Sequence, residues 1–185
     1  MSSTPLPPDS ALYSHALFLP DEAATESLAA HLAAIFSDYF STTYAGPTTE
    51  GKRAAVYMKG DLGAGKTTFV RHFLLSMGVK GRIKSPTYTL LETYNISSLY
   101  LYHFDFYRFS DNNEWLDAGF RENLSENAIV FIEWAEKAGP GLPKPDLELN
   151  LIYESAGRTA QINAFSEKGK TWITQLIQRQ MPANG

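Results

Sequence analysis

The chain has 185 residues, of which 44% are hydrophobic, and this length and composition suit one domain with a sizeable core. Its formal net charge of −4 provides no general basic surface, which argues against a protein that grips nucleic acid by itself. The absence of cysteine excludes disulfides, cysteine-held zinc and thiol catalysis, and it suits a reducing compartment.

The N-terminal segment is predicted to be a flexible tail over residues 1–14. It contains Pro5, Pro7 and Pro8 but neither the basic start nor the apolar stretch of a signal peptide. No apolar run in the chain is long enough to span a bilayer. We therefore expect one domain over residues 15–180 in a cytoplasmic protein that does not contact a membrane.

A helix is predicted over residues 21–39, with acids in its first turn and an apolar face. That face consists of Leu28, Leu32, Ile35 and Tyr39. Residues 41–51 form a polar linker, and the apolar run at residues 54–58 then predicts a buried strand.

Residues 60–68 read G-D-L-G-A-G-K-T-T and match G-x-x-x-x-G-K-[ST], the loop that wraps a nucleotide's phosphates. A predicted strand precedes this phosphate loop and a predicted helix over residues 67–76 follows it, as the motif requires. We expect the amides and Lys66 to hold the phosphates and the Thr67 hydroxyl to ligate magnesium. The expected nucleotide contacts in the loop are Asp61, Leu62, Gly63, Ala64, Gly65, Lys66, Thr67 and Thr68.

Two further segments are candidates for the same site. The loop at residues 84–90 contains Thr87, and a threonine in such a loop can sense the γ-phosphate and magnesium. An aromatic strand predicted over residues 99–109 contains Asp105, whose burial would be costly without magnesium, its water shell or Arg108 as partner. We expect Asp105 to orient the hydrolytic water or the metal's water shell, and we expect His103 to be structural.

The continuous apolar run at residues 128–132 predicts a strand buried on both faces, after a charged helix over residues 113–124. Glu133 ends that strand, where the acidic magnesium ligand of a phosphate-loop protein belongs; a surface acid is the alternative. The remaining expected elements are a loop marked by Pro140, Pro143 and Pro145, an antiparallel hairpin over 147–153 and 158–165, and a last helix containing Trp172, Ile173, Leu176 and Ile177. The predicted fold class is α/β, a three-layer P-loop NTPase with a mainly parallel sheet plus antiparallel strands.

Four segments, in this order and spacing, resemble the TsaE family of small bacterial ATPases, which act in placing threonylcarbamoyladenosine in tRNA. They are the phosphate loop at 60–68, S-P-T-Y-T-L at 85–90, H-F-D-F-Y-R at 103–108 and I-E-W at 132–134. The resemblance runs from about residue 18 to residue 165 and includes L-P-D-E-A-A-T at 19–25.

The resemblance implies bound ATP, Mg²⁺ held by Thr67 and Glu133, and catalytic roles for Lys66, Asp105 and Glu133. It also implies that Thr87 lies in a switch-like loop and Thr25 near the adenine. The implied partners are the TsaD and TsaB proteins, with tRNA contacted only through that complex. ATP hydrolysis would reset the complex and would not itself make the modification.

A small-molecule kinase of the P-loop class is the main alternative, because it uses the same loop and a strand-end aspartate. Such kinases commonly carry an arginine-rich lid, whereas here no arginine follows Glu133 before Arg158. A GTPase is disfavoured by the lack of an N-K-x-D sequence, and a non-hydrolysing scaffold by the intact set of site residues.

Overall fold

The computed structural model of the chain describes residues 10–41, 52–111, 114–117, 119–120, 123 and 127–180. The predicted linker, apart from Ser41, lies outside the described residues, as do most of the predicted tail and part of the predicted helix at 113–124. The predicted tail and domain limits stay predictions. In the described part, no helix has the length and apolar character needed to cross a membrane.

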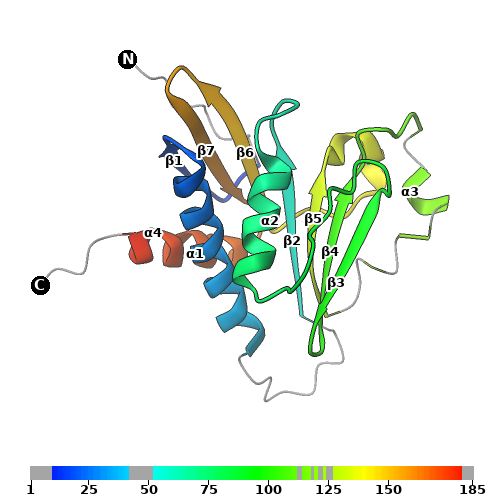
Figure 1. Ribbon diagram of the computed structural model, residues 1–185, viewed down its shortest axis with the longest axis horizontal. Coiled ribbons are helices and arrows are strands. Elements are labelled where there is room, and N and C mark those ends of the chain that lie inside the picture. The colour runs from blue at the N-terminus through cyan, green and yellow to red at the C-terminus, as the bar shows by residue number, and fades with distance from the viewer. Residues whose placement is uncertain are drawn as a thin grey trace, which may run out of the picture.

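The centre of the molecule is a seven-stranded sheet in the order β1-β7-β6-β2-β5-β4-β3 (Figure 1). The strands are β1 (Tyr13–Leu19), β2 (Arg53–Lys59), β3 (Leu91–Ile96), β4 (Leu99–Asp105), β5 (Ala128–Glu133), β6 (Leu147–Glu154) and β7 (Gly157–Ala164). Strands β6, β2, β5 and β4 run parallel, whereas β3 at one edge and β7 and β1 at the other are antiparallel to their neighbours. The predicted sheet composition is therefore confirmed.

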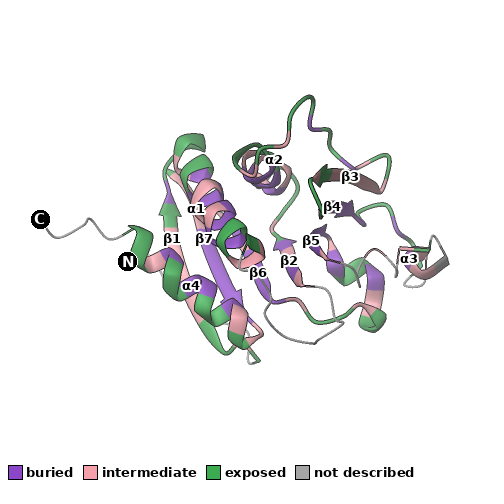
Figure 2. Cartoon of the chain, turned by 90° about the horizontal axis from the view of Figure 1, so that it is seen from below, coloured by how far each residue is buried: buried purple, intermediate pink, exposed green. Residues whose placement is uncertain are grey.

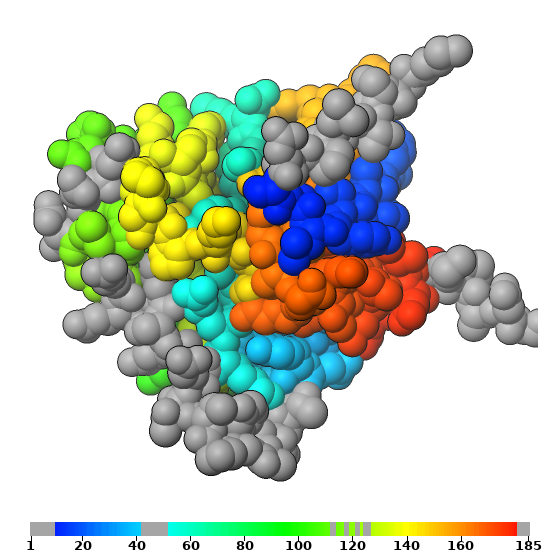
Figure 3. Space-filling model, turned by 180° about the vertical axis from the view of Figure 1, so that it is seen from behind, coloured from blue at the N-terminus to red at the C-terminus, as the bar shows by residue number. Residues whose placement is uncertain are grey.

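Helices α1 (Glu22–Ser41), α2 (Lys66–Ser76) and α4 (Glu167–Gln180) pack on one face of the sheet. The opposite face of β4 and β5 is covered by the 3-10 helix η2 (Ala135–Gly141) and the short helix α3 (Glu114–Asp117), which gives three layers. Figure 3 shows the yellow segment that contains η2 at the surface on this side of the molecule.

Strand β5 is buried along its whole length because it contributes side chains to a core on each face. Ile129 and Phe131 lie in the core under the helices, and Val130 and Ile132 lie in the core under η2. Figure 2 shows that the buried residues concentrate on the central strands and on the helix sides that face them. The strand therefore requires an apolar residue at every position up to Ile132, before Glu133 ends it in the cavity.

The structure corrects several predicted boundaries. The aromatic strand ends at Asp105, not at residue 109, because the chain turns there and Phe109 N donates to Phe106 O. The predicted helix at 113–124 is helical over Glu114–Asp117 within the described residues, and the predicted proline loop contains η2. The edge strands β1 and β3 were not predicted, and β1 includes Tyr13 and Ser14 of the predicted tail.

Asp146 joins three elements at the amino end of β6. Its buried carboxylate accepts hydrogen bonds from Ala55 N at 2.9 Å and Ser166 Oγ at 2.8 Å, and Lys168 Nζ lies 3.1 Å away. The side chain thus connects β2 to the segment that enters α4.

Asp146→Ala is expected to lower the free energy of unfolding by about 2–4 kcal/mol, because a buried amide, a hydroxyl and an ammonium lose their partner. Urea denaturation measures the change. The control is Glu26→Ala on the exposed side of α1, where the contact with His72 is 4.0 Å long and a change of about 0.5 kcal/mol or less is expected. Equal effects of the two substitutions would contradict the role of Asp146.

Candidate functional site

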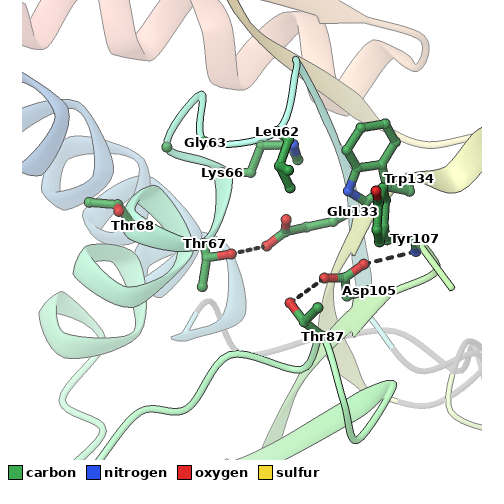
Figure 4. A pocket seen from close by; sticks show the side chains of 11 residues that line it. Leu62, Gly63, Lys66, Thr67, Thr68, Thr87, Asp105, Tyr107, Glu133 and Trp134 are labelled. Carbon is green, nitrogen blue, oxygen red and sulfur yellow. Dashed lines mark hydrogen bonds between the residues drawn. The ribbon is translucent and has the colours of Figure 1, made fainter.

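A cavity of about 200 Å³ opens where the parallel strands β2, β4 and β5 end. Strand β2 leads into the phosphate loop, while Asp105 ends β4 and pairs in register with Glu133 at the end of β5. The cavity is lined by Leu62, Gly63, Gly65, Lys66, Thr67, Thr68, Thr87, Asp105, Tyr107, Glu133 and Trp134 (Figure 4). Carboxyl ends of parallel strands are where open α/β sheets bind ligands.

The backbone of the phosphate loop favours glycine at two positions. Gly60 and Gly63 have φ values of 128° and 79°. A Cβ on Gly60 would lie 2.4 Å from Leu151 O, and one on Gly63 would lie 2.9 Å from the Tyr153 hydroxyl. The loop therefore packs closely against β6, where a Cβ at either position would not fit without a shift.

Lys66 carries the cation of the cavity, and the residue is 5% exposed. Its Nζ donates to Gly60 O at 2.8 Å and Asp61 O at 3.0 Å and lies 4.4 Å from the centre of the Trp134 ring. Burial lowers the pKa of Lys66, whereas the carboxylates of Glu133 and Asp105 act in the opposite direction. The ammonium is held against its own loop by groups that an anionic ligand can replace.

Thr67 and Glu133 form the pair of oxygen ligands expected of a magnesium site. Thr67 Oγ1, in the first turn of α2, donates to Glu133 Oε1 at 2.7 Å (Figure 4). Among the described residues no group of three or more His, Cys, Asp or Glu side chains could hold a metal ion. A divalent cation at this pair would therefore need phosphate and water oxygens as its other ligands, the coordination that Mg²⁺ prefers.

Asp105 is connected to the loop at residues 84–90. Its Oδ2 accepts from Thr87 Oγ1 at 2.8 Å and its Oδ1 accepts from Tyr107 N at 2.9 Å. The alternative in which Arg108 pairs with Asp105 is not what the structure shows. Instead, Arg108 Nε donates to Thr87 O at 2.9 Å and the guanidinium lies 4.5 Å from the Tyr88 ring centre.

Three of the predicted contact residues do not line the cavity. Thr25 is buried in the first turn of α1, where its hydroxyl donates to Asp21 O at 3.3 Å. Asp61 is exposed and contributes its carbonyl to Lys66, whereas Ala64, in the middle of the loop, is fully buried in the core under the helices. The expected proximity of Thr25 to the adenine stays a prediction.

Sequence reasoning did not single out Trp134, Tyr107 and Arg158 as site residues. Trp134 has a left-handed backbone, with φ 59° and ψ 41°, and its ring contacts that of Tyr107 at 5.1 Å. Arg158 Nε lies 3.6 Å from the position of a Cβ on Gly65, and it has no hydrogen-bond partner among the described residues. The sequence feature that could have identified Arg158 is its place at the start of the strand that follows the hairpin turn.

The family model of the "Threonylcarbamoyl adenosine biosynthesis protein TsaE" matches residues 19–161. The chain is 43% identical over 123 residues to the tRNA threonylcarbamoyladenosine biosynthesis protein TsaE of Haemophilus influenzae, covering 66% of this chain and 78% of the relative. It is 35% identical over 115 residues to the protein of that name from Bacillus subtilis, covering 62% of this chain and 70% of the relative.

A solved structure, the crystal structure of Bacillus subtilus YdiB, superposes with a TM-score of 0.68 at 24% identity. The match covers 91% of this chain and 97% of that chain, so the two proteins share a fold. The predicted P-loop fold class is thereby confirmed.

Proposed function

The chain belongs to the TsaE family, and we propose that it is a magnesium-dependent ATPase of tRNA threonylcarbamoyladenosine biosynthesis that acts through the TsaB and TsaD proteins. The observation that carries the proposal is one cavity lined by a phosphate loop, a Thr67–Glu133 oxygen pair and Asp105. Each of these groups has a separate role in phosphoryl transfer to water.

The chain's own residues perform the binding steps. In this proposal Lys66 exchanges its two carbonyl partners for β- and γ-phosphate oxygens, and the loop amides surround the phosphates. Thr67 and Glu133 would hold a magnesium ion, which when bound would neutralise the charge that develops on the phosphates. Arg158 lies beside the loop with a buried Nε–H that has no hydrogen-bond partner among the described residues, and in this proposal it is a further anion contact.

In the same proposal, Asp105 orients and deprotonates the water molecule that attacks the γ-phosphate. Its two hydrogen-bond partners, the Thr87 hydroxyl and the Tyr107 amide, are both neutral, so they orient the carboxylate without cancelling its charge. A carboxylate held in this way can accept a hydrogen bond from a water near the γ-phosphate and receive its proton. Transfer to water, with release of inorganic phosphate, is the proposed reaction.

Calorimetric titration tests the nucleotide and the metal together. ATP with Mg²⁺ is expected to bind more tightly than ATP with EDTA, because the oxygen pair at Thr67 and Glu133 contributes only when the ion is present. ATP is also expected to bind more tightly than GTP. Absence of binding in every condition, or equal affinity with and without Mg²⁺, would overturn the proposed function.

Thr87→Ala is expected to reduce the stimulation of ATPase activity by the TsaB–TsaD pair while leaving ATP affinity largely unchanged. The substitution removes the hydrogen bond that connects the loop at 84–90 to Asp105 but leaves Lys66 and the loop amides, the proposed phosphate contacts, in place. Slow nucleotidases commonly depend on a partner to order such a loop. A phosphate-release assay with and without the purified pair measures the effect.

The matched control is Thr89→Ala, in the same loop, whose hydroxyl donates to Glu92 and not to Asp105. The TsaB–TsaD pair is expected to stimulate the ATPase activity of this variant as much as that of the unmodified protein. Full stimulation of Thr87→Ala would contradict the role given to its hydroxyl.

A further inference from the structure

His103 is buried on β4, two residues before Asp105, and it contacts the cavity residue Glu133. Its side chain is 1% exposed, and its Nε2 lies 2.9 Å from Oε1 of Glu133, whose side chain is 4% exposed. Because an ionised carboxylate can only accept, Nε2–H is the donor of this hydrogen bond. The histidine is thus part of the environment of the proposed magnesium ligand.

The two carboxylate oxygens of Glu133 have different hydrogen-bond contacts. Oε1 accepts from both His103 Nε2 and Thr67 Oγ1, whereas Oε2 has no hydrogen-bond partner among the described residues. Figure 4 shows that oxygen directed away from Thr67. Two donors therefore fix one oxygen, so that the other is available to a cation. Thr67 also keeps its lone pairs available, because its proton is donated to Oε1.

The two donors are not equivalent. Thr67 is itself a proposed ligand of the ion, and its hydroxyl rotates about a single bond, whereas the imidazole ring is locked in the packed sheet. In addition, His103 Nδ1 is buried with no partner among the described residues. No other polar contact among these residues therefore accounts for a histidine at this position.

We propose that His103 is a positioning residue that holds the Glu133 carboxylate in the orientation required for Mg²⁺. The proposal rests on the proposed function, since it needs an ion at Thr67 and Glu133. Outer partners of metal-binding side chains commonly act in this way, and their loss typically weakens metal affinity or activity by about 10- to 100-fold.

Two substitutions separate the hydrogen bond from the presence of a ring. The amide nitrogen of glutamine reaches about as far along the side chain as Nε2, so His103→Gln keeps a donor to Glu133. The amide of asparagine ends nearer the backbone, so His103→Asn loses that donor. His31→Asn on α1 is the matched control, because His31 also has a buried Nδ1 without a partner among the described residues but lies on a helix away from Glu133, the residue that His103 contacts.

The readout is the affinity for a fluorescent ATP analogue as a function of Mg²⁺ concentration, compared with the affinity in EDTA. His103→Asn should raise the Mg²⁺ concentration for half-maximal tightening by about tenfold or more, with little change in the EDTA affinity. His103→Gln should recover most of the loss, and His31→Asn should match the unmodified protein. A loss in His103→Asn that His103→Gln does not recover would overturn the proposal.

Failure of this proposal is distinguishable from failure of the proposed function. If the unmodified protein shows no Mg²⁺-dependent tightening, the proposed function falls and the role of His103 falls with it. If the unmodified protein shows tightening and His103→Asn shows the same Mg²⁺ dependence, only the role of His103 is overturned.

A second comparison covers the case in which His103→Asn does not fold. His103→Met fills a similar volume without a donor and is expected to give the same loss. In a Glu133→Gln background, where no carboxylate is left to hold, either substitution should add little, since effects of residues that act through one another are non-additive. A full additional loss in that background would contradict the proposal.

Discussion

Lys66→Ala is expected to weaken binding of ATP with Mg²⁺ by about 2–3 kcal/mol, or roughly 30- to 150-fold. The substitution removes the ammonium that lies inside the phosphate loop, bonded to the carbonyls of Gly60 and Asp61. The phosphates would then lack the one side-chain cation that lines the cavity among the described residues. Fluorescence anisotropy with a labelled ATP analogue measures the loss.

Lys170→Ala is the control for this prediction, because Lys170 is an exposed lysine on α4 outside the cavity. Its affinity for the analogue is expected to equal that of the unmodified protein. Thermal unfolding of both variants distinguishes a binding defect from loss of folded protein. An unchanged affinity of folded Lys66→Ala would show that the loop does not hold phosphates as proposed.

Asp105→Asn is expected to lower ATP turnover about ten- to a thousandfold and to leave Mg²⁺–ATP affinity nearly unchanged. Asparagine keeps the size of the side chain and an acceptor for Tyr107 N, but it loses the charge that would orient and deprotonate the water. Single-turnover phosphate release, measured at saturating nucleotide, reports the change.

Glu133→Gln is expected to differ from Asp105→Asn, because it should weaken nucleotide binding as well as turnover. An amide is a poorer ligand for Mg²⁺ than a carboxylate, so Mg²⁺-dependent binding and turnover are expected to fall together. If Asp105→Asn lost metal-dependent binding while Glu133→Gln lost turnover alone, the roles of the two acids would be the reverse of those proposed.

The central elements of the fold were predictable because each carries a clear sequence pattern, either of buried apolar residues or of the phosphate-loop motif. Strand β5 is apolar at nearly every position because it faces a core on each side, and the phosphate-loop motif defines the junction of β2 and α2. The edge strands carry no such pattern. Phe18 on β1 is 56% exposed, and within the described part of the chain β1 pairs with β7 alone, which lies far along the sequence.

The end of β4 was wrongly predicted for a related reason. Phe106 and Phe109 continue the apolar character of the strand after the chain has left the sheet. Both rings are buried in the second core, against η2 and α3. An apolar residue indicates that a position is buried, but not that it lies in a strand. Because the buried residues here continue into a turn, composition alone could not show where the strand ends.

The site was predictable as a set of residues but not as a set of contacts. The acids at the ends of β4 and β5 follow from strand ends and motif spacing, whereas the Thr87–Asp105 hydrogen bond depends on how a loop folds back. The same fold directs Arg108 to a carbonyl of that loop and away from Asp105. Arg158 reaches the phosphate loop only because β6 and β7 pack beside it.

Phosphate release in ¹⁸O-labelled water is the most direct test of the central claim that this chain transfers the γ-phosphate of ATP to water. Hydrolysis places one oxygen of the attacking water in the released phosphate, which mass spectrometry detects. We predict labelled inorganic phosphate, formed slowly by the chain alone and faster when the TsaB–TsaD pair is added. Unlabelled phosphate, or phosphate found on a small acceptor molecule, would contradict the account and favour a kinase.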